Sequence, residues 1–188
     1  RNPFNTIFGY TELLIDAIRR ADYANLERYG NIIQSASERA LSFLVNMLEW
    51  SRSGSGKIPF KAEAVEVKKL ALEVVSLLRY HADMKQIRIR LDLPDDLVVQ
   101  ADRNMFRTIA INLLSNAIKF SNRESEILIS VQADSRGFRF SVRDHGIGMT
   151  AEDISGLFMA SGKKSRTGTG NEKGTGLGLV LCQDFAER

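Results

Sequence analysis

The stretch NLLSNAIKFS, from Asn112 to Ser121, is the most informative part of this chain for both fold and function class. Asn112, Asn116 and Lys119 are spaced i, i+4 and i+7, so a helix places them on one face. Apolar residues flank that face: Ile111, Leu114, Ala117 and Ile118. The pattern alone fits two hypotheses, a polar site beside a buried wall or an ordinary amphipathic helix with two solvated amides.

Two glycine-rich motifs follow this helix. DHGIGM runs from Asp144 to Met149, and GTGLGL runs from Gly174 to Leu179. Glycine lets the backbone approach a ligand closely, although surface turns use the same residues. An asparagine-bearing helix, then DxGxG, then GxGxG, in this order, is far more restrictive than any one of the motifs. The order indicates a ligand site built from three separated segments.

These motifs resemble those of the sensor histidine kinases, whose nucleotide-binding module belongs to the GHKL ATPase superfamily. NLLSNAIKFS resembles the N box, DHGIGM the G1 box, Leu157-Phe158 the F box and GTGLGL the G2 box. The resemblance extends over essentially the whole chain. It implies an ATP-dependent protein histidine kinase of a two-component signalling system, which phosphorylates a histidine and then passes the group to an aspartate of a response regulator.

Length and composition limit the other interpretations. The 188 residues, of which 44% are hydrophobic, are enough for one large or two small domains with a core. Basic residues exceed acidic ones by only three, which argues poorly for nucleic acid as a partner. Cys182 is the single cysteine, so an intrachain disulfide is excluded, and no Cys/His spacing suggests zinc. Apolar runs fall well short of the ~20 residues of a membrane helix, so we expect a cytoplasmic chain whose parent protein can still carry an anchor and an upstream sensor domain.

The first fifty residues predict two helices. An apolar stripe with 3-4 spacing predicts a helix up to about Arg20, and a second stripe keeps heptad spacing from Leu26 to Trp50. A two-helix hairpin cannot bury both stripes, so we expect a homodimer in which two hairpins form a four-helix bundle. The alternative is that both helices pack on the rest of the same chain.

The opening RNPF, which begins at Arg1, resembles the end of the kinase H box. This resemblance implies that the phosphoacceptor histidine lies three residues before Arg1, outside this chain. It also matches Asn2 to the position that orients water for dephosphorylation, although a surface amide in a first helical turn gives the same pattern. His81 and His145 are better explained as ordinary structural histidines.

A stretch rich in serine and glycine, residues 51–56, marks a linker and a domain boundary. We divide the chain into a dimerisation hairpin (1–53), a linker (54–62) and a catalytic ATP-binding domain (63–188) that is expected to lack the last strands of the family's fold. Alternation and periodicity predict strands at 64–67, 87–93, 97–100, 127–133 and 138–142, and helices at 69–84, after a capping Asp102, and from 176 to about 187. This order predicts an α+β two-layer sandwich with its helices on one face of the sheet.

The resemblance implies ATP and Mg²⁺ as cofactors and assigns roles to the N box. Asn116 would be the principal Mg²⁺ ligand and Asn112 its helper, since amide oxygens suit this metal. Lys119 would place a positive charge near the phosphates. Phe120 would flank the nucleoside, and the alternative for it is a core aromatic.

The G1 box is assigned to the base of the nucleotide in the same way. Asp144 would accept a hydrogen bond from the adenine amino group, and a carboxylate there would repel the carbonyl that guanine presents. Gly146 and Gly148 would let the backbone wrap the base. Asp-x-Gly is also a common turn, and this remains the alternative for the motif taken alone.

The segment 157–175 is long, polar and glycine-rich, so we expect a lid over the nucleotide. Phe158 would hinge this lid or anchor it on the core. Gly176 is expected to open a helix whose N–H groups meet the γ-phosphate. Candidate nucleotide contacts along this stretch are Lys163, Lys164, Ser165, Lys173, Gly174, Thr175, Gly176, Leu177 and Gly178. The charged residues of a solvated loop would show the same pattern.

The position four residues before Asn116 separates a kinase from a hydrolase. By resemblance, ATP-hydrolysing relatives such as DNA gyrase carry a glutamate there that activates water, whereas this chain has Asn112. Without that base water is a poor nucleophile, and the phosphoryl group is kept for an imidazole. Two alternatives to the kinase stay open, a GHKL-type ATPase or chaperone and a degenerate nucleotide-sensing dimerisation module.

Overall fold

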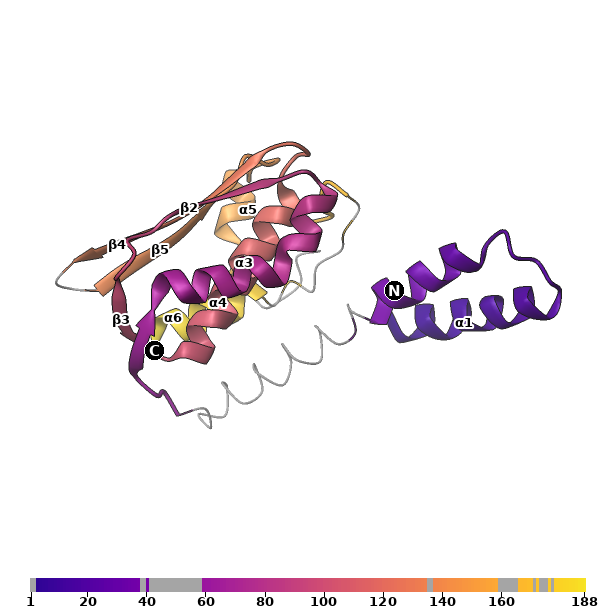
Figure 1. Cartoon of the computed structure of the whole chain (residues 1–188), viewed down its shortest axis with the longest axis horizontal. Coiled ribbons are helices and arrows are strands. Elements are labelled where there is room, and N and C mark those ends of the chain that lie inside the picture. Colours follow the sequence, from indigo (N-terminus) through magenta and orange to yellow (C-terminus); the bar gives the residue numbers. More distant parts are fainter. Residues whose placement is uncertain are drawn as a thin grey trace. The chain divides into compact units, whose positions relative to one another are not determined.

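The computed structural model describes residues 3–37, 40, 59–134, 137–158, 166–170, 172, 176 and 178–188 (Figure 1). The chain divides into two compact units, Arg1–Lys57 and Ile58–Arg188. The expected linker at 51–56 lies outside the described residues. Within the described ranges, no helix is both long enough and apolar enough to cross a membrane.

The first unit is a helical hairpin. α1 runs over Pro3–Arg19, and residues 26–37 form the second helix. Ala21 has a φ of 52° in the turn between them. The rings of Tyr10 and Tyr29 meet across the hairpin with their centroids 5.9 Å apart. Both predicted helices are therefore confirmed here, while the second stripe beyond residue 40 lies outside the described residues.

Much of the apolar surface of α1 is exposed. Its single buried residue is Ala17. Five large apolar side chains of this helix are 40% to 72% exposed: Phe4, Phe8, Leu13, Ile15 and Ile18. A hairpin buries one seam between its two helices and leaves its other apolar surface to a second copy or to the rest of the same chain. The predicted dimeric bundle would cover this surface and stays a prediction.

The second unit is a layered α+β structure in which helices cover one side of a sheet (Figure 1). Its elements in chain order are β1 (Glu63–Glu66), α3 (Val67–Met84), β2 (Arg88–Asp92), β3 (Val98–Ala101), α4 (Arg103–Phe120), β4 (Glu126–Asp134), β5 (Gly137–Arg143), α5 (Ala151–Ser155) and α6 (Gly178–Glu187). β4 and β5 form the predicted antiparallel hairpin, and β1 pairs antiparallel with β3. β2 runs parallel to β4, a pairing that the sequence did not predict. The predicted α+β class is confirmed.

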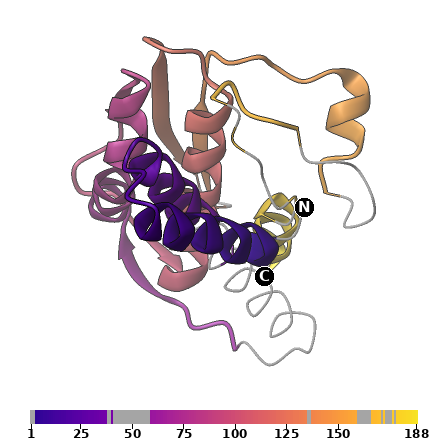
Figure 2. The ribbon, with the colours of Figure 1, turned by 90° about the vertical axis from the view of Figure 1, so that its right-hand side faces the viewer.

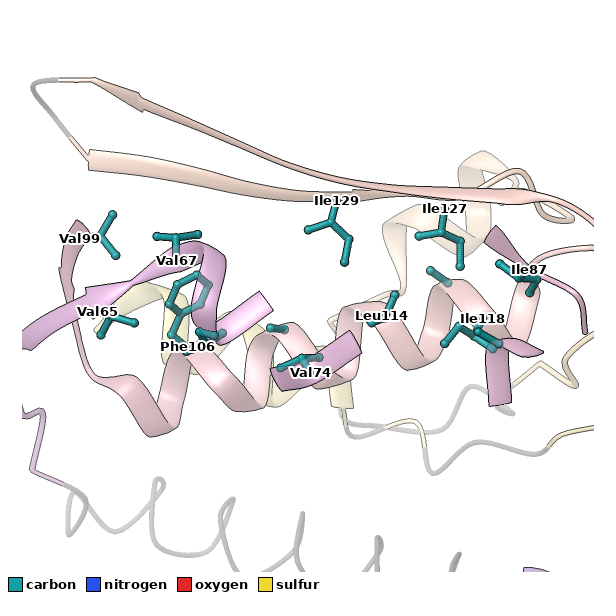
Figure 3. Packing of buried hydrophobic residues seen from close by; sticks show 14 residues of the cluster. Val65, Val67, Val74, Ile87, Val99, Phe106, Leu114, Ile118, Ile127 and Ile129 are labelled. Carbon is teal, nitrogen blue, oxygen red and sulfur yellow. The ribbon is translucent and has the colours of Figure 1, made fainter. Parts of the chain in front are cut away.

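The core of this unit lies between the three-stranded sheet β2-β4-β5 and the helices α3 and α4. Figure 3 shows Ile127 and Ile129 on β4 facing Leu114 and Ile118 on α4. All four side chains are at most 4% exposed. Burying one large aliphatic side chain contributes about 1.5–3 kcal/mol. This packing fixes which face of α4 turns to the sheet.

α4 is held at its first turn by Asp102. One carboxylate oxygen accepts hydrogen bonds from the backbone N–H groups of Asn104 and Met105, each at 3.0 Å. The other accepts from the N–H of Lys61, also at 3.0 Å. The predicted capping role of Asp102 is thus confirmed. α6 packs on α4 through a second apolar cluster: Met105, Ile109, Leu181 and Phe185.

Three details differ from the predictions. Val67 begins α3 instead of ending the first strand. α6 begins at Gly178, because Gly176 has a φ of 76° and cannot belong to a right-handed helix. The short helix α5 was not predicted, although Thr150 and Asp153 form a capping box at its start. Figure 2 shows α5 well to one side of α4 and α6.

Candidate functional site

The polar face of α4 carries Asn112, Asn116 and Lys119, all half-buried. The Nδ2 group of Asn112 donates to the carbonyl oxygen of Thr108 at 3.0 Å, so the helix itself orients this amide. Its Oδ1 lies against Gly178, where an added Cβ would overlap it. The beginning of α6, where the first N–H groups of a helix have no partner within the helix, therefore meets the asparagine face of α4.

The loop after β5 is tied to the C-terminal end of α4. The N–H of Ile147 donates to the carbonyl oxygen of Phe120 at 3.2 Å, and Ser121 and Gly146 form an isolated antiparallel bridge. A Cβ at Gly146 would overlap the same Phe120 carbonyl, so this approach requires glycine. Oδ1 of Asp144 accepts the N–H of Gly146 at 2.9 Å, which orients a carboxylate that is otherwise exposed. The N-box and G1-box motifs thus meet at one end of α4.

Arg166 connects this loop to α5. Its Nη1 donates to the carbonyl oxygen of Gly148 at 3.1 Å and lies 2.9 Å from Oδ2 of Asp153. Gly148 has a φ of 64°, a conformation that residues with a side chain rarely adopt. Glycine at this position therefore lets the loop present its carbonyl to Arg166.

Lys119 is partly desolvated beside an aromatic ring. Its Nζ lies 4.6 Å from the centroid of the Phe120 ring, within the range of a cation–π contact. Burial lowers the pKa of Lys119, Glu172 opposes that effect, and nearby Lys85 adds to it. An ammonium in such surroundings attracts an anion more strongly than one in water does. Phe120 belongs to neither apolar cluster of the described residues, and its place beside the nucleoside stays a prediction.

The sequence did not predict three further residues at this site, namely Lys85, Thr169 and Glu172. Nζ of Lys85 donates to Oγ1 of Thr169 at 2.9 Å and lies 2.7 Å from Oε1 of Glu172. The N–H of Thr169 donates to the carbonyl oxygen of Lys119 at 3.0 Å. The only sequence signal for Lys85 is a lysine just after a predicted helix, which is common at helix ends. Nothing in that signal points to partners so far along the chain.

Part of the predicted site lies outside the described residues: Asn2, Lys163, Lys164, Ser165, Lys173, Gly174, Thr175 and Leu177. Phe158 is 49% exposed, which argues against its anchoring on the core, and its alternative role as a hinge stays a prediction because residues 159–165 lie outside the described residues. Nδ1 of His145 lies 3.0 Å from the carbonyl oxygen of Glu126, which is a structural contact. Among the described side chains, no three His, Cys, Asp or Glu residues converge as metal ligands. A metal here would depend on amide oxygens, phosphates and water.

Two surface hollows lie elsewhere on this unit. One of about 310 Å³ is lined by Gln86, Arg88 and residues 124–126, and one of about 620 Å³ lies beside Lys68 and Asp95. Neither is lined by a predicted site residue. The candidate site is therefore defined by the convergence of α4, the loop after β5 and the start of α6, and not by either hollow.

Comparison with known proteins adds a family match. Residues 101–188 match the family described as histidine kinase-, DNA gyrase B-, and HSP90-like ATPase. This range contains α4, the loop after β5 and α6, the elements that converge at the candidate site. The histidine protein kinase DivJ of Caulobacter vibrioides is 26% identical over 192 residues, which is 100% of this chain and 31% of that protein. The chain spans between 19% and 36% of the length of the curated relatives it matches.

Solved structures resemble this chain as well. The histidine kinase AdeS of Acinetobacter baumannii matches 98% of this chain and 83% of its own, with a TM-score of 0.72 and 22% identity, a likeness of fold. Full-length ShkA in complex with AMPPNP matches 86% of this chain and 33% of its own, with a TM-score of 0.67 and 25% identity.

Proposed function

Since this chain carries the ATP-binding catalytic core of a sensor histidine kinase, we propose that it binds Mg²⁺–ATP and passes the γ-phosphoryl group to a histidine of its parent protein. The acceptor is the residue three positions before Arg1, to which the RNPF motif aligns the family's histidine. From there the group passes to an aspartate of a response regulator. Residues 63–188 are the proposed catalytic domain and residues 1–53 the proposed dimerisation hairpin.

The observation that carries this proposal is the junction between the N-box helix and the G1 loop. The hydrogen bond from Ile147 to Phe120 and the close approach of Gly146 bring the two motifs to one end of α4. They are separated in sequence, so the junction is a product of the fold and not of local turn chemistry. A site for one extended ligand needs this kind of convergence.

Asn116 and Asn112 are the proposed Mg²⁺ ligands. They lie one turn apart on α4, and the amide nitrogen of Asn112 is already engaged by Thr108, which leaves Oδ1 towards the start of α6. Mg²⁺ takes one or two protein oxygens and completes its shell from phosphates and water. When bound, the metal supplies charge neutralisation at the phosphates. Lys119 adds a further positive charge at the same end of the helix.

The remaining nucleotide contacts are proposed on the same basis. Asp144 would accept the adenine amino group, and its orientation by the N–H of Gly146 supports a preset carboxylate. At the start of α6, backbone N–H groups near Gly178 are available to a phosphate. The contacts proposed along the stretch before and into this helix are Lys164, Ser165, Gly174, Thr175, Gly176, Leu177 and Gly178.

Asn112 favours the kinase over a hydrolase. A carboxylate at this position could activate water, but an amide cannot take a proton from it. The Nδ2 group of Asn112 also donates to the carbonyl oxygen of Thr108, so the helix orients this amide. The phosphoryl group is therefore kept for the imidazole of the parent protein.

The partners are proposals too. The exposed apolar side chains of α1, Phe8 at 72% and Ile18 at 53% among them, support a bundle formed with a second copy of the hairpin. Asn2 is the proposed residue for dephosphorylation. A response-regulator receiver domain and an upstream sensor domain complete the proposed assembly.

Isothermal titration calorimetry of this chain with ATP and Mg²⁺ tests the nucleotide site. Asn116→Ala is expected to weaken binding by at least about tenfold, as the loss of groups that hold a metal does. The matched control is Gln132→Ala, which removes an exposed amide from β4 and should bind like the wild type. Equal affinity in Asn116→Ala would remove the metal assignment. A folded wild type that binds no nucleotide would remove the proposed function.

Labelling of the longer parent protein with γ-labelled ATP tests the transfer. We expect a labelled protein whose phosphate is lost in acid and is absent when the histidine three positions before Arg1 is replaced. Steady release of phosphate without labelled protein would favour the ATPase alternative. Nucleotide binding with neither labelling nor hydrolysis would favour the nucleotide-sensing module.

A further inference from the structure

Lys85 is a buried cation that the proposed chemistry does not use. The residue is only 8% exposed, and it directly follows α3. Its Nζ donates to the carbonyl oxygens of Ile118 and Lys119 and to Oγ1 of Thr169, each at 2.9 Å, and lies 2.7 Å from Glu172. An ammonium has three N–H donors, so all of them are engaged. A lysine that is this buried and this fully bonded has a defined position.

Two of these partners belong to the last turn of α4. The final carbonyls of a helix have no partner within the helix, and cations stabilise that end of the helix dipole. Lys85 therefore caps α4 at the turn that carries Lys119 and Phe120. Lys85 contacts the backbone carbonyls of this turn, so we expect its effect on Lys119 and Phe120 to be transmitted through the backbone of α4.

The other two partners come from the docked segment, which we define as residues 166–170 and Glu172. Thr169 donates its hydroxyl to the carbonyl oxygen of Ser121 at 2.6 Å and its N–H to that of Lys119 at 3.0 Å. The N–H of Gly168 donates to the carbonyl oxygen of Glu172 at 2.8 Å, and that of Gly170 to its carboxylate at 2.7 Å. Lys85 thus joins the end of α4 to a self-bonded turn of this segment.

The docked segment packs on the side chain of Lys119. A Cβ at Gly168 would lie 2.5 Å from Cγ of Lys119 and 2.7 Å from its carbonyl oxygen. This contact limits the directions that the lysine stem can take. The Glu172 carboxylate, paired with Lys85, also acts on the charge of Lys119. The segment and its ion pair therefore restrict both the position and the surroundings of the Lys119 ammonium.

We propose that Lys85 is a positioning residue for nucleotide binding: with Thr169 and Glu172 it fastens the docked segment to the end of α4, and thereby holds Lys119 towards the phosphates. The role of Lys119 in this statement rests on the proposed function. The fastening of the docked segment does not rest on the proposed function, because its contacts are present in the chain without nucleotide.

Hydrogen exchange of the nucleotide-free chain tests the fastening. In Lys85→Met, the amides of Gly168, Thr169 and Gly170 should exchange at least about tenfold faster, since local opening no longer breaks the lysine contacts. Lys68→Met is the matched control, because it removes a lysine of α3 whose partner is the exposed Asp95. Thr169→Val removes the hydroxyl bridge while leaving Lys85 in place, and gives the same test should Lys85→Met fail to fold. Unchanged exchange of these amides in a folded variant overturns the proposal.

Nucleotide affinity in a double-mutant cycle separates positioning from mere stabilisation. Lys85→Met should weaken ATP binding about tenfold in the wild type, but have little further effect in a Lys119→Met background, because residues that act through one contact are not additive. An equal loss in both backgrounds overturns the positioning role. If the wild type binds no ATP, the proposed function fails, whereas the exchange experiment still decides whether Lys85 fastens the segment.

Discussion

The backbone of Gly178 lies against the side-chain amide of Asn112, so closely that a Cβ at position 178 would overlap Oδ1. This contact joins the first residue of α6 to the polar face of α4. The overlapping atom, Oδ1 of Asn112, lies at the end of a side chain, which can rotate away from the added Cβ. A substitution here would therefore move the amide more than it would disturb the fold.

Gly178→Ala is expected to weaken Mg²⁺–ATP binding while leaving stability nearly unchanged. The methyl group displaces the Asn112 oxygen, and alanine is a better helix former than glycine, which offsets part of any strain. Calorimetry with ATP and urea unfolding measure the two effects. Gly9→Ala in α1 is the matched control, because nothing lies within 4 Å of its added Cβ. A loss of stability without a loss of affinity would contradict this assignment.

Gly146→Ala should behave in the opposite way. Its Cβ would overlap the backbone carbonyl of Phe120, which cannot rotate aside. We expect a loss of about 1–3 kcal/mol in the free energy of unfolding, as for other overpacked positions. Urea unfolding measures it, and Gly30→Ala, where a Cβ meets nothing within 4 Å, is the control. A variant as stable as the wild type would mean that the loop after β5 is not held on α4.

The capping residue Asp102 gives a test of the fold alone. Asp102→Ala removes the acceptor of three backbone N–H groups, those of Asn104, Met105 and Lys61. Loss of a helix cap costs about 0.5–2 kcal/mol, so the urea midpoint should fall while the folded protein still binds ATP. Asp95→Ala, which removes an exposed carboxylate paired with Lys68, is the control. A normal midpoint in Asp102→Ala would contradict the capping role.

Local signals in the sequence were sufficient where the structure depends on neighbours in the chain. Asp102 could be predicted as a cap because capping involves residues two and three positions on. The capping box of Thr150 and Asp153 carries the same kind of signal for α5 and was overlooked. Gly176 could not be assigned correctly, because glycine is compatible both with a helix start and with the φ of 76° that it adopts.

Long-range contacts could not be predicted in this way. Alternating residues predict the strands β2 and β4, but the period of two is the same for a parallel and an antiparallel neighbour. Lys85 bonds to Thr169 over 84 positions, and no pattern around either residue indicates the other. The glycine and asparagine motifs predicted a site at the end of α4. The buried Lys85 next to this site could be identified only from the packing.

The proposed dimer has a direct test in α1. Ile15 is 44% exposed on an apolar surface, so Ile15→Asp should place a charge in the bundle and shift the chain to a monomer. Sedimentation measures the mass, and far-ultraviolet circular dichroism checks that the helices remain. Asn5→Asp adds the same charge at an exposed polar position of α1 and should leave the dimer intact. A wild type that is monomeric at high concentration would remove the bundle.

The pH dependence of ATP binding should report on Lys119. Its pKa is lowered from 10.5, chiefly by burial, so its positive charge is lost at a lower pH than that of an ordinary lysine. Affinity for ATP should therefore fall as the pH rises through this lowered pKa. The pKa of Glu172 is itself lowered from 4.5, because its bonds with Lys85 and with backbone N–H groups outweigh its burial, so it is ionised throughout this range.

Glu172→Gln should move that fall in affinity to a still lower pH. The negative charge of Glu172 raises the pKa of Lys119, and its removal leaves burial and the charge of Lys85, both of which lower it. Measuring the affinity for ATP between about pH 7 and about pH 10 gives the pH at which it falls in each variant, and this pH is compared with the ordinary pKa of lysine. Asp95→Asn, which neutralises a carboxylate paired with Lys68, should keep the wild-type profile. A shift to higher pH in Glu172→Gln would show that another group controls the affinity and that the charge of Glu172 does not act on Lys119.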